Sequence, residues 1–410
     1  MVYTETEAFI PEVGVDSAGV ERSTVGFEFR SLDTRLPQPL SDFTAVQDEA
    51  TGLVYIAGGC NSPKGNEYFA DFDFYGCVSI SNKIYVFDET ASNFTTLPDM
   101  PRQRYRHAAA VVNSQLWLVG GRDVTDTLVS EVDVSHLVEG IVSFVCLLTI
   151  LQVYDFGSGQ WSFFTDLAEE FWMSDLTGFA KDGFAYFAGG YNAEYTAQKT
   201  VFSIDVAESS VQGQLSVQFR APMQHARGDV SSVVSNDGTF AMVVGGFTHE
   251  NDFCEPLGVA EKYTFVDELW TDVAPLGSSR SDKALVDLNG SIFALGGETS
   301  YEGYCDIPEP PRPGELIEAI DDIEIYDPEE NQWEVLDKLP EHRFRFAAVG
   351  YDDIESIYVF GGQLAYQEDC QCFPASNEIV VLSESGGSMM ASSFLAIACT
   401  CVLSISLAWL

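Results

Sequence analysis

Short apolar segments recur along the chain, and six of them end in a pair of glycines. They read VYIAGG, LWLVGG, AYFAGG, AMVVGG, IFALGG and IYVFGG, and their last residues are Gly59, Gly121, Gly190, Gly246, Gly297 and Gly362. Short apolar runs bounded by turn residues are typical of buried strands. A motif that returns at intervals of 51 to 69 residues predicts one supersecondary unit used six times.

Pairs of aromatic residues seven positions apart follow four of the six glycine pairs. These pairs are Phe87 and Phe94, Tyr154 and Trp161, Tyr263 and Trp270, and Tyr326 and Trp333. The pattern therefore predicts four short strands in each unit, which together form one small sheet. Six such sheets bury their faces when they pack around a common axis. We expect the glycines where a side chain would crowd the next sheet, and the aromatic pairs between sheets. The third unit is degenerate, because Phe202 and Phe219 are too far apart for the usual spacing.

These motifs resemble the kelch repeat over residues 24–383. The resemblance implies an all-β fold, a six-bladed β-propeller with four antiparallel strands per blade. The sixth unit ends at the segment NEIVVL (377–382) and lacks its own outermost strand. We therefore expect Phe27–Arg30 to complete the last blade and to hold the two ends of the propeller together.

Residues 134–152 interrupt the second unit with an apolar run that lacks turn residues. Without them the chain reads SEVD-VYDFGSGQW, a regular repeat. We interpret the segment as a retained intron, because Val-Ser can be encoded by GTAAGT and Gln by CAG, which are typical splice boundaries. The alternative is a genuine helical insertion on the rim.

The two ends of the chain predict opposite cellular locations. Residues 384–410 contain the small residues Gly386, Gly387 and Ser388 followed by an apolar tail, and this order resembles a GPI-attachment signal. A transmembrane tail anchor is the alternative. Residues 1–23 lack the features of a secretory signal. Either the gene sequence lacks its first exon and the protein is at the cell surface, which we favour, or the propeller faces the cytosol.

Cysteines and sequons favour the extracellular reading. Six cysteines lie in polar loops, and an even loop set is typical of disulfides formed in an oxidising compartment: Cys60, Cys77, Cys254, Cys305, Cys370 and Cys372. We expect Cys60–Cys77 and Cys254–Cys305, which leaves Cys370 and Cys372, whose bridge would be strained. Asn93 and Asn289 stand in glycosylation sequons.

The formal net charge of −43 argues against nucleic acid or an anionic membrane surface as the partner, because phosphates would be repelled. We expect no cofactor. Calcium is the alternative, and its carboxylate ligands would come from Asp71 and Asp73, or from Asp321, Asp322 and Glu324.

Arginines recur at the start of the innermost predicted strands, at Arg104, Arg227, Arg280 and Arg343. The kelch resemblance implies that arginines at this position hold acidic ligands, with His107 nearby as a further candidate. The alternative is a structural role in which they pair with acidic residues. Because successive strands alternate in direction, the loops after the glycine pairs and the turns that carry these arginines lie on the same face of the propeller. We expect ligands to bind on this face, because binding residues are often carried by loops on a rigid scaffold.

Three functions follow from these features. The first is a membrane-anchored, monomeric binding or adhesion module that presents its loops to a protein or a glycan. The second is an extracellular kelch-type enzyme, similar to a sugar epimerase or an oxidase, acting at the channel mouth on a small acid or sugar. The third is a cytosolic, tail-anchored scaffold. We expect binding rather than catalysis, because the five histidines show no metal-ligand spacing and no nucleophile or nucleotide motif is present.

Overall fold

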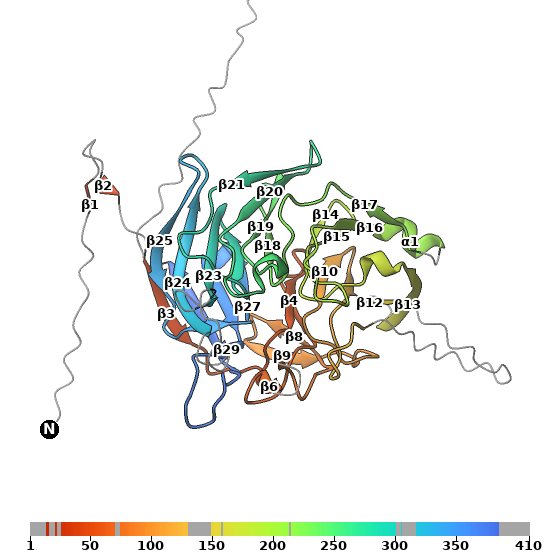
Figure 1. The fold of residues 1–410 in the computed structure, drawn as a ribbon, viewed down its shortest axis with the longest axis horizontal. Helices are drawn as coiled ribbons and strands as arrows, with labels where there is room; N and C mark the ends of the chain where they lie inside the picture. Colours follow the sequence, from red (N-terminus) through yellow and green to blue (C-terminus); the bar gives the residue numbers. More distant parts are fainter. Residues whose placement is uncertain are drawn as a thin grey trace, which may run out of the picture.

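Six four-stranded antiparallel sheets surround a central channel (Figure 1). The computed structural model describes residues 14–15, 21–22, 26–69, 74–129, 149–156, 159–212, 215–300, 305 and 317–384. The first strand of each sheet lines the channel, and these six strands contact one another in a closed circle. The predicted six-bladed propeller is confirmed.

The strands of each blade run outward from the channel in sequence order. In blades one to three they are β4 (Thr44–Gln47), β5 (Val54–Ala57), β8 (Ile84–Asp88) and β9 (Asn93–Thr96); β10 (Ala108–Val112), β11 (Gln115–Val119), β12 (Thr149–Asp155) and β13 (Gln160–Leu167); and β14 (Thr177–Lys181), β15 (Phe184–Ala188), β16 (Val201–Asp205) and β17 (Val217–Phe219). In blades four and five they are β18 (Ser231–Val234), β19 (Phe240–Val244), β20 (Ala260–Thr264) and β21 (Leu269–Val273); and β22 (Ala284–Leu288), β23 (Ser291–Ser300), β24 (Ile317–Asp327) and β25 (Gln332–Lys338).

Blade six closes the propeller with a strand from the other end of the chain. Its strands are β27 (Ala347–Tyr351), β28 (Ser356–Phe360), β30 (Ile379–Glu384) and β3 (Phe27–Ser31). β3 pairs antiparallel with β30, with Phe29 opposite Leu382. In Figure 1 the red β3 lies against the blue part of the chain. The predicted closing strand is confirmed and is one residue longer than expected.

Smaller elements decorate this frame. They are the pairs β1 (Gly14–Val15) with β2 (Glu21–Arg22), β6 (Glu67–Phe69) with β7 (Phe74–Gly76), and β26 (Arg343–Phe344) with β29 (Gln363–Leu364); helix α1 (Val206–Gln212); and the 3-10 turns at Glu169–Phe171, His249–Asn251 and Asp352–Ile354.

The core consists of six apolar clusters, one between each pair of adjacent blades. The paired aromatics lie in these layers, and their ring centroids are 5.1–5.3 Å apart in all four pairs. In blade three, Phe202 and Phe219 also lie opposite one another across β16 and β17. Helix α1 occupies the connection between them, so the longer spacing lengthens the turn and leaves the register unchanged. The ring of Phe171 contacts both phenylalanine rings.

The glycine pairs stand where adjacent blades touch. At the first glycine of each pair, a Cβ atom would lie 2.1–2.7 Å from a backbone carbonyl oxygen of the next blade. At the second glycine φ is between +90° and +115°, a region that side chains avoid. The predicted reason for the glycines, lack of space beside a neighbouring blade, is confirmed.

Several predictions concern segments that the structure describes only in part. Of the insertion 134–152, residues 149–152 lie in β12, where Gln152 pairs with Leu118 of β11. Residues 134–148 and the candidate attachment sites Gly386, Gly387 and Ser388 lie outside the described residues. Within the described part of the chain, no helix has the length and apolar character to cross a membrane.

Candidate functional site

The four recurrent arginines, which we call the blade arginines (Arg104, Arg227, Arg280 and Arg343), each lie four residues before an innermost strand and are almost completely buried. Each donates a hydrogen bond from Nη1 to the carbonyl oxygen of the first glycine of the pair in its own blade, over 2.6–3.2 Å. They therefore tie the backbone at the end of the second strand to the segment that leads into the first. None of the four is exposed to the channel, and the structural alternative accounts for their contacts.

Two blade arginines also form ion pairs with a glutamate of the third strand in their own blade. Arg227 Nη2 lies 3.0 Å from Glu261 Oε1, and Arg280 pairs with Glu324. Each glutamate also accepts hydrogen bonds from two backbone amides. Burial lowers the pKa of Arg227 to about 10 and that of Arg104, which has no such glutamate, to about 9. All remain charged at neutral pH.

His107 lies among the residues that line the channel cavity and is itself buried. Its Nε2 is 3.2 Å from Thr44 Oγ1. Burial, followed by the charge of Arg104, holds the pKa of His107 well below its usual range. The imidazole is therefore neutral at physiological pH.

A second set of charged residues lies two positions before the first residue of each innermost strand. We call these six residues the channel ring: Asp42, Arg106, Asp175, Asp229, Asp282 and Arg345. All six have φ between 48° and 58°. Each backbone N–H donates to the carbonyl oxygen of the ring residue in the preceding blade over 2.8–3.3 Å, and the six bonds form a closed circle. Aspartate is among the residues that tolerate this left-handed conformation best.

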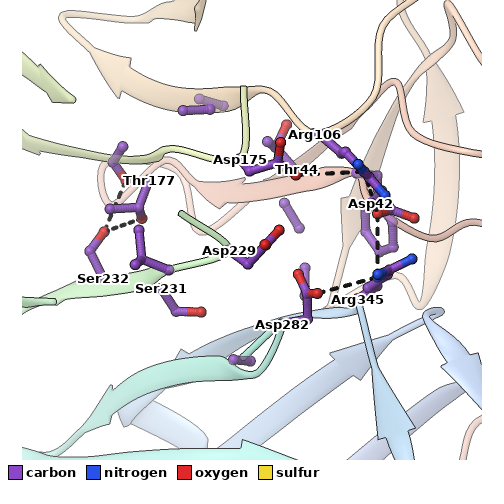
Figure 2. Close-up of a pocket in the computed structure, with 18 of the residues that line it drawn as sticks. Asp42, Thr44, Arg106, Asp175, Thr177, Asp229, Ser231, Ser232, Asp282 and Arg345 are labelled. Carbon is purple, nitrogen blue, oxygen red and sulfur yellow. Dashed lines mark hydrogen bonds and ion pairs between the residues drawn. The ribbon is translucent and has the colours of Figure 1, made fainter. Parts of the chain in front are cut away.

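The charges around the channel ring are unevenly distributed (Figure 2). Arg106 Nε lies 3.5 Å from both Asp42 and Asp175. Arg345 Nε lies 3.2 Å from Asp282 Oδ2 and 3.7 Å from Asp42 Oδ1. Both arginines thus flank Asp42, and the opposite side of the ring carries three successive aspartates.

Asp229, in the middle of those three, accepts a hydrogen bond of 2.7 Å from the Tyr191 hydroxyl. Burial, followed by the neighbouring charge of Asp175, raises the pKa of Asp229 well above its usual range. Burial and the charge of Asp229 do the same to Asp282. Asp229 and Asp282 therefore ionise less readily than free carboxyl groups.

The ring borders a cavity of about 210 Å³ that continues between the first residues of the innermost strands. Its wall includes a hydrogen bond of 2.6 Å between Thr177 and Ser232 (Figure 2). Lys283 also lines the cavity, and its buried amino group donates to the carbonyl oxygen of Val244. Burial lowers the pKa of Lys283 to about 7. At the other end of the channel, the turns between first and second strands surround a wider hollow of about 1230 Å³.

The ring end of the channel carries the connections between second and third strands, and we call their described residues the loop face (58–69, 74–83, 120–129, 189–200, 245–259, 305 and 361–378). Disulfides join Cys60 to Cys77 and Cys254 to Cys305, as predicted. Cys370 and Cys372 are also joined, with their Cα atoms 5.2 Å apart. The chain reverses at Gln371, where φ is 51°, and this turn brings the two cysteines together in spite of their short separation.

Three large apolar side chains of the loop face, Val78, Val124 and Phe253, are exposed to solvent. Phe253 packs edge-on against Tyr191, with ring centroids 5.4 Å apart. Because Tyr191 also binds Asp229, this contact links the loop surface to the channel ring.

The remaining candidates lie elsewhere. Asn93 and Asn289 are both exposed, in β9 and in the turn between β22 and β23. Asp321 and Asp322 pair with Lys338, and Glu324 pairs with Arg280, so these carboxylates already face cations. Asp71 and Asp73 lie outside the described residues.

His225, Glu261 and Asp272 bring ligand atoms within 4.8 Å of one another, a spacing that would suit a metal ion. Glu261, however, is engaged by Arg227 and by the backbone amides of Gln224 and His225. A metal ion would have to displace a buried guanidinium, so this group is better explained as the end of the Arg227 ion pair.

Sequence reasoning selected the blade arginines and missed the channel ring. The available signal was position: four ring residues follow a blade arginine by two residues. Asp42 and Asp175 follow Leu40 and Met173, which occupy the same position of the repeat, by the same step. With 63 acidic residues in the chain, composition alone did not distinguish the four ring aspartates.

No protein-family profile matches the chain. Among curated proteins, alpha-scruin of Limulus polyphemus is 23% identical over 285 residues, which cover 67% of this chain and 27% of alpha-scruin. Kelch-like protein 40 of Mus musculus is 23% identical over 309 residues, which cover 74% of this chain and 41% of that protein. The chain thus matches less than half of the length of either relative.

Among solved structures, that of YjhT superimposes with a TM-score of 0.62 at 17% identity, covering 86% of this chain and 99% of YjhT. At this level of identity the likeness concerns the fold. It agrees with the six blades described above.

Proposed function

Because the chain is a kelch-repeat β-propeller, we propose that it is a protein-binding module whose contact surface is the loop face. The observation that carries this proposal is that all three disulfides of the described residues lie in the loop face. Crosslinks of this kind limit the freedom of loops, so less conformational entropy is lost when a partner binds. A glycan is the alternative ligand for the same surface.

Exposed apolar side chains on the same face support a protein partner. Val124 and Phe253 are 52% and 37% exposed and stand on the loops of blades two and four. Apolar and aromatic side chains that are exposed in the free protein contribute most of the affinity in many protein interfaces. The fold therefore supplies a rigid frame, and the loop face supplies the contacts.

The test compares loop-face substitutions with a matched substitution on the opposite side of a blade. We expect the double variant Val124→Ser, Phe253→Ser to lose most of the partner that is crosslinked to the purified wild-type protein. Val266, 88% exposed in the turn between β20 and β21, is the control, because strand alternation places that turn at the other end of the blade. Equal partner recovery with the double variant and with Val266→Ser would exclude the loop face as the contact surface.

We further propose that the propeller acts outside the cell and is attached to the membrane through residues 384–410. Three disulfides support an oxidising compartment. Intact mass of the protein from its native membrane tests both points. We expect reduction to add six hydrogens to the three disulfides, and a phospholipase that cleaves GPI anchors to release a chain that ends near Gly387. Free thiols and a full-length chain without lipid would support the cytosolic scaffold.

A further inference from the structure

Three successive residues of the channel ring, Asp175, Asp229 and Asp282, form what we call the acidic arc. Elsewhere in the ring, an arginine stands between two aspartates: Arg106 between Asp42 and Asp175, and Arg345 between Asp282 and Asp42. Among the described residues no arginine or lysine forms an ion pair with Asp229.

The arc contains acceptor capacity that the described chain leaves unused. Asp175 is 7% exposed, and its Oδ2 atom has no hydrogen-bond partner among the described residues. Asp229 accepts a hydrogen bond from the Tyr191 hydroxyl, and its carboxyl group lies within hydrogen-bonding reach of Asp175. A buried carboxylate oxygen without a donor is costly, so a cationic donor placed here would gain strong charge-assisted hydrogen bonds.

The size and position of the cavity limit what can enter it. Its volume of about 210 Å³ is below the roughly 300–1,000 Å³ of typical sites for whole small molecules. It is suited to the end of one long side chain. The ring lies at the loop-face end of the channel, where a bound protein would be, and the net charge of −43 attracts cations toward it.

The molecule already binds a guanidinium group close to this place. Arg122 lies 3.7 Å over the ring of Tyr195 and 3.7 Å from Asp126 Oδ2, and it donates to the carbonyl oxygens of Asp126 and Asn192. Carboxylate, aromatic ring and carbonyl groups are thus arranged around a cation one blade from the arc.

We propose that the acidic arc binds one guanidinium or ammonium group, carried by an arginine or lysine side chain of the protein that contacts the loop face. This inference rests on the proposed function and specifies the chemistry of the partner. The cation lies between Asp175 and Asp229, where it replaces the arginine that other parts of the ring contain. Among partners that fit the loop face equally well, the acidic arc then favours those that insert a positively charged side chain.

The test uses N-acetyl-arginine amide as the probe and N-acetyl-citrulline amide as its neutral, nearly isosteric control. Dissociation constants are measured by ligand-observed NMR for the wild-type protein, Asp229→Asn and Asp182→Asn. Both substitutions replace an ionisable carboxyl group with a neutral amide at a position with positive φ, which asparagine tolerates. Asp182 belongs to the hollow at the other end of the channel, so its variant controls for net charge.

We expect the arginine probe to bind the wild-type protein and Asp182→Asn equally, to bind Asp229→Asn at least tenfold more weakly, and the citrulline probe not to bind. Absence of binding to the wild-type protein, equal binding to Asp229→Asn with an unchanged melting temperature, or equal binding of citrulline would overturn the proposal. The two proposals can fail separately. If the Val124→Ser, Phe253→Ser variant loses partner crosslinking but one of these three probe results is obtained, the loop-face function stands and only the cation site is rejected.

Discussion

Blades five and two contain the same buried arginine in different surroundings. In blade five, Arg280 binds the carbonyl oxygen of Gly296 and forms an ion pair with Glu324. In blade two, Arg104 binds the carbonyl oxygen of Gly120, and its Nε and Nη2 atoms have no hydrogen-bond partner among the described residues. The common contact is the backbone carbonyl at the glycine pair, so the primary role of this arginine is to hold the blade backbone, and the glutamate balances its charge.

The difference arises from the third strand. Glu261 and Glu324 each stand two residues before the blade tyrosine, Tyr263 or Tyr326. The corresponding residue before Tyr154 in blade two is Gln152, the last residue of the segment 134–152. If that segment were absent, Asp133 would take this position. The segment that disturbs the repeat therefore also removes a carboxylate from the position opposite Arg104.

The largest effect is expected for Arg280→Met, which leaves Glu324 buried without its cation. Breaking a buried ion pair in this way costs about 3–5 kcal/mol of unfolding free energy. We expect Arg104→Met to cost less than half as much, because no carboxylate among the described residues loses its partner. Chemical denaturation of both variants measures the difference. Equal losses would show that the carbonyl contact alone accounts for both arginines.

Deletion of residues 134–152 should have the next largest effect. Asp133 would then face Arg104, and a hydrogen bond to a charged group contributes about 1.5–3 kcal/mol. We expect the shortened protein to be more stable by an amount in this range, and the additional change Asp133→Asn to remove the gain. If the shortened protein were less stable than the full chain, the segment would be a genuine part of the blade. Its codons should then be present in the sequences of mature transcripts.

Lys283 tests whether a buried cation with only a carbonyl partner destabilises the propeller. Burial lowers the pKa of Lys283 in the folded protein to about 7, below that of the unfolded chain. The unfolded chain therefore binds more protons above pH 7, and stability rises with pH by about 1 kcal/mol between pH 7 and 8. We expect this rise to be absent in Lys283→Met. Denaturation curves at the two pH values check the slope, and a rise that persists in the variant would assign it to other groups.

The smallest effect is expected for Asp229→Asn at low pH. The pKa of Asp229 in the folded protein lies above that of the unfolded chain, so the folded state binds more protons and stability falls as pH rises from about 4. The variant should flatten this dependence without loss of stability at neutral pH, in contrast to Arg280→Met. Melting temperatures from pH 4 to 7 measure it, and an unchanged slope would mean that Asp229 titrates normally.

Sequence reasoning predicted the features that repeat in every blade. The glycine pairs, the paired aromatics and the closing strand follow from local patterns, since strand length, alternation and turn residues are readable over a few positions. Blade three shows the limit of spacing rules, because Phe202 and Phe219 meet across β16 and β17 although helix α1 separates them in sequence.

The candidate site depended on more than local pattern. Arg104 and Arg106 are two residues apart, and nothing in their spacing shows that the first is buried in the blade while the second belongs to the channel ring. Arg106 adopts φ of 56°, a backbone conformation rare for arginine, because a circle of six inter-blade hydrogen bonds requires it. Such a circle exists only when all six blades are assembled.

The sequence by itself determined the number of blades, their closure and two of the three disulfides, because each is encoded by a repeated motif or by cysteines in neighbouring loops. Only the tertiary structure decided which charged residues face the channel and how they are paired. The reason is that the ring residues are far apart in sequence and meet around an axis, where burial and the charges of neighbouring blades, not local propensity, set their ionisation.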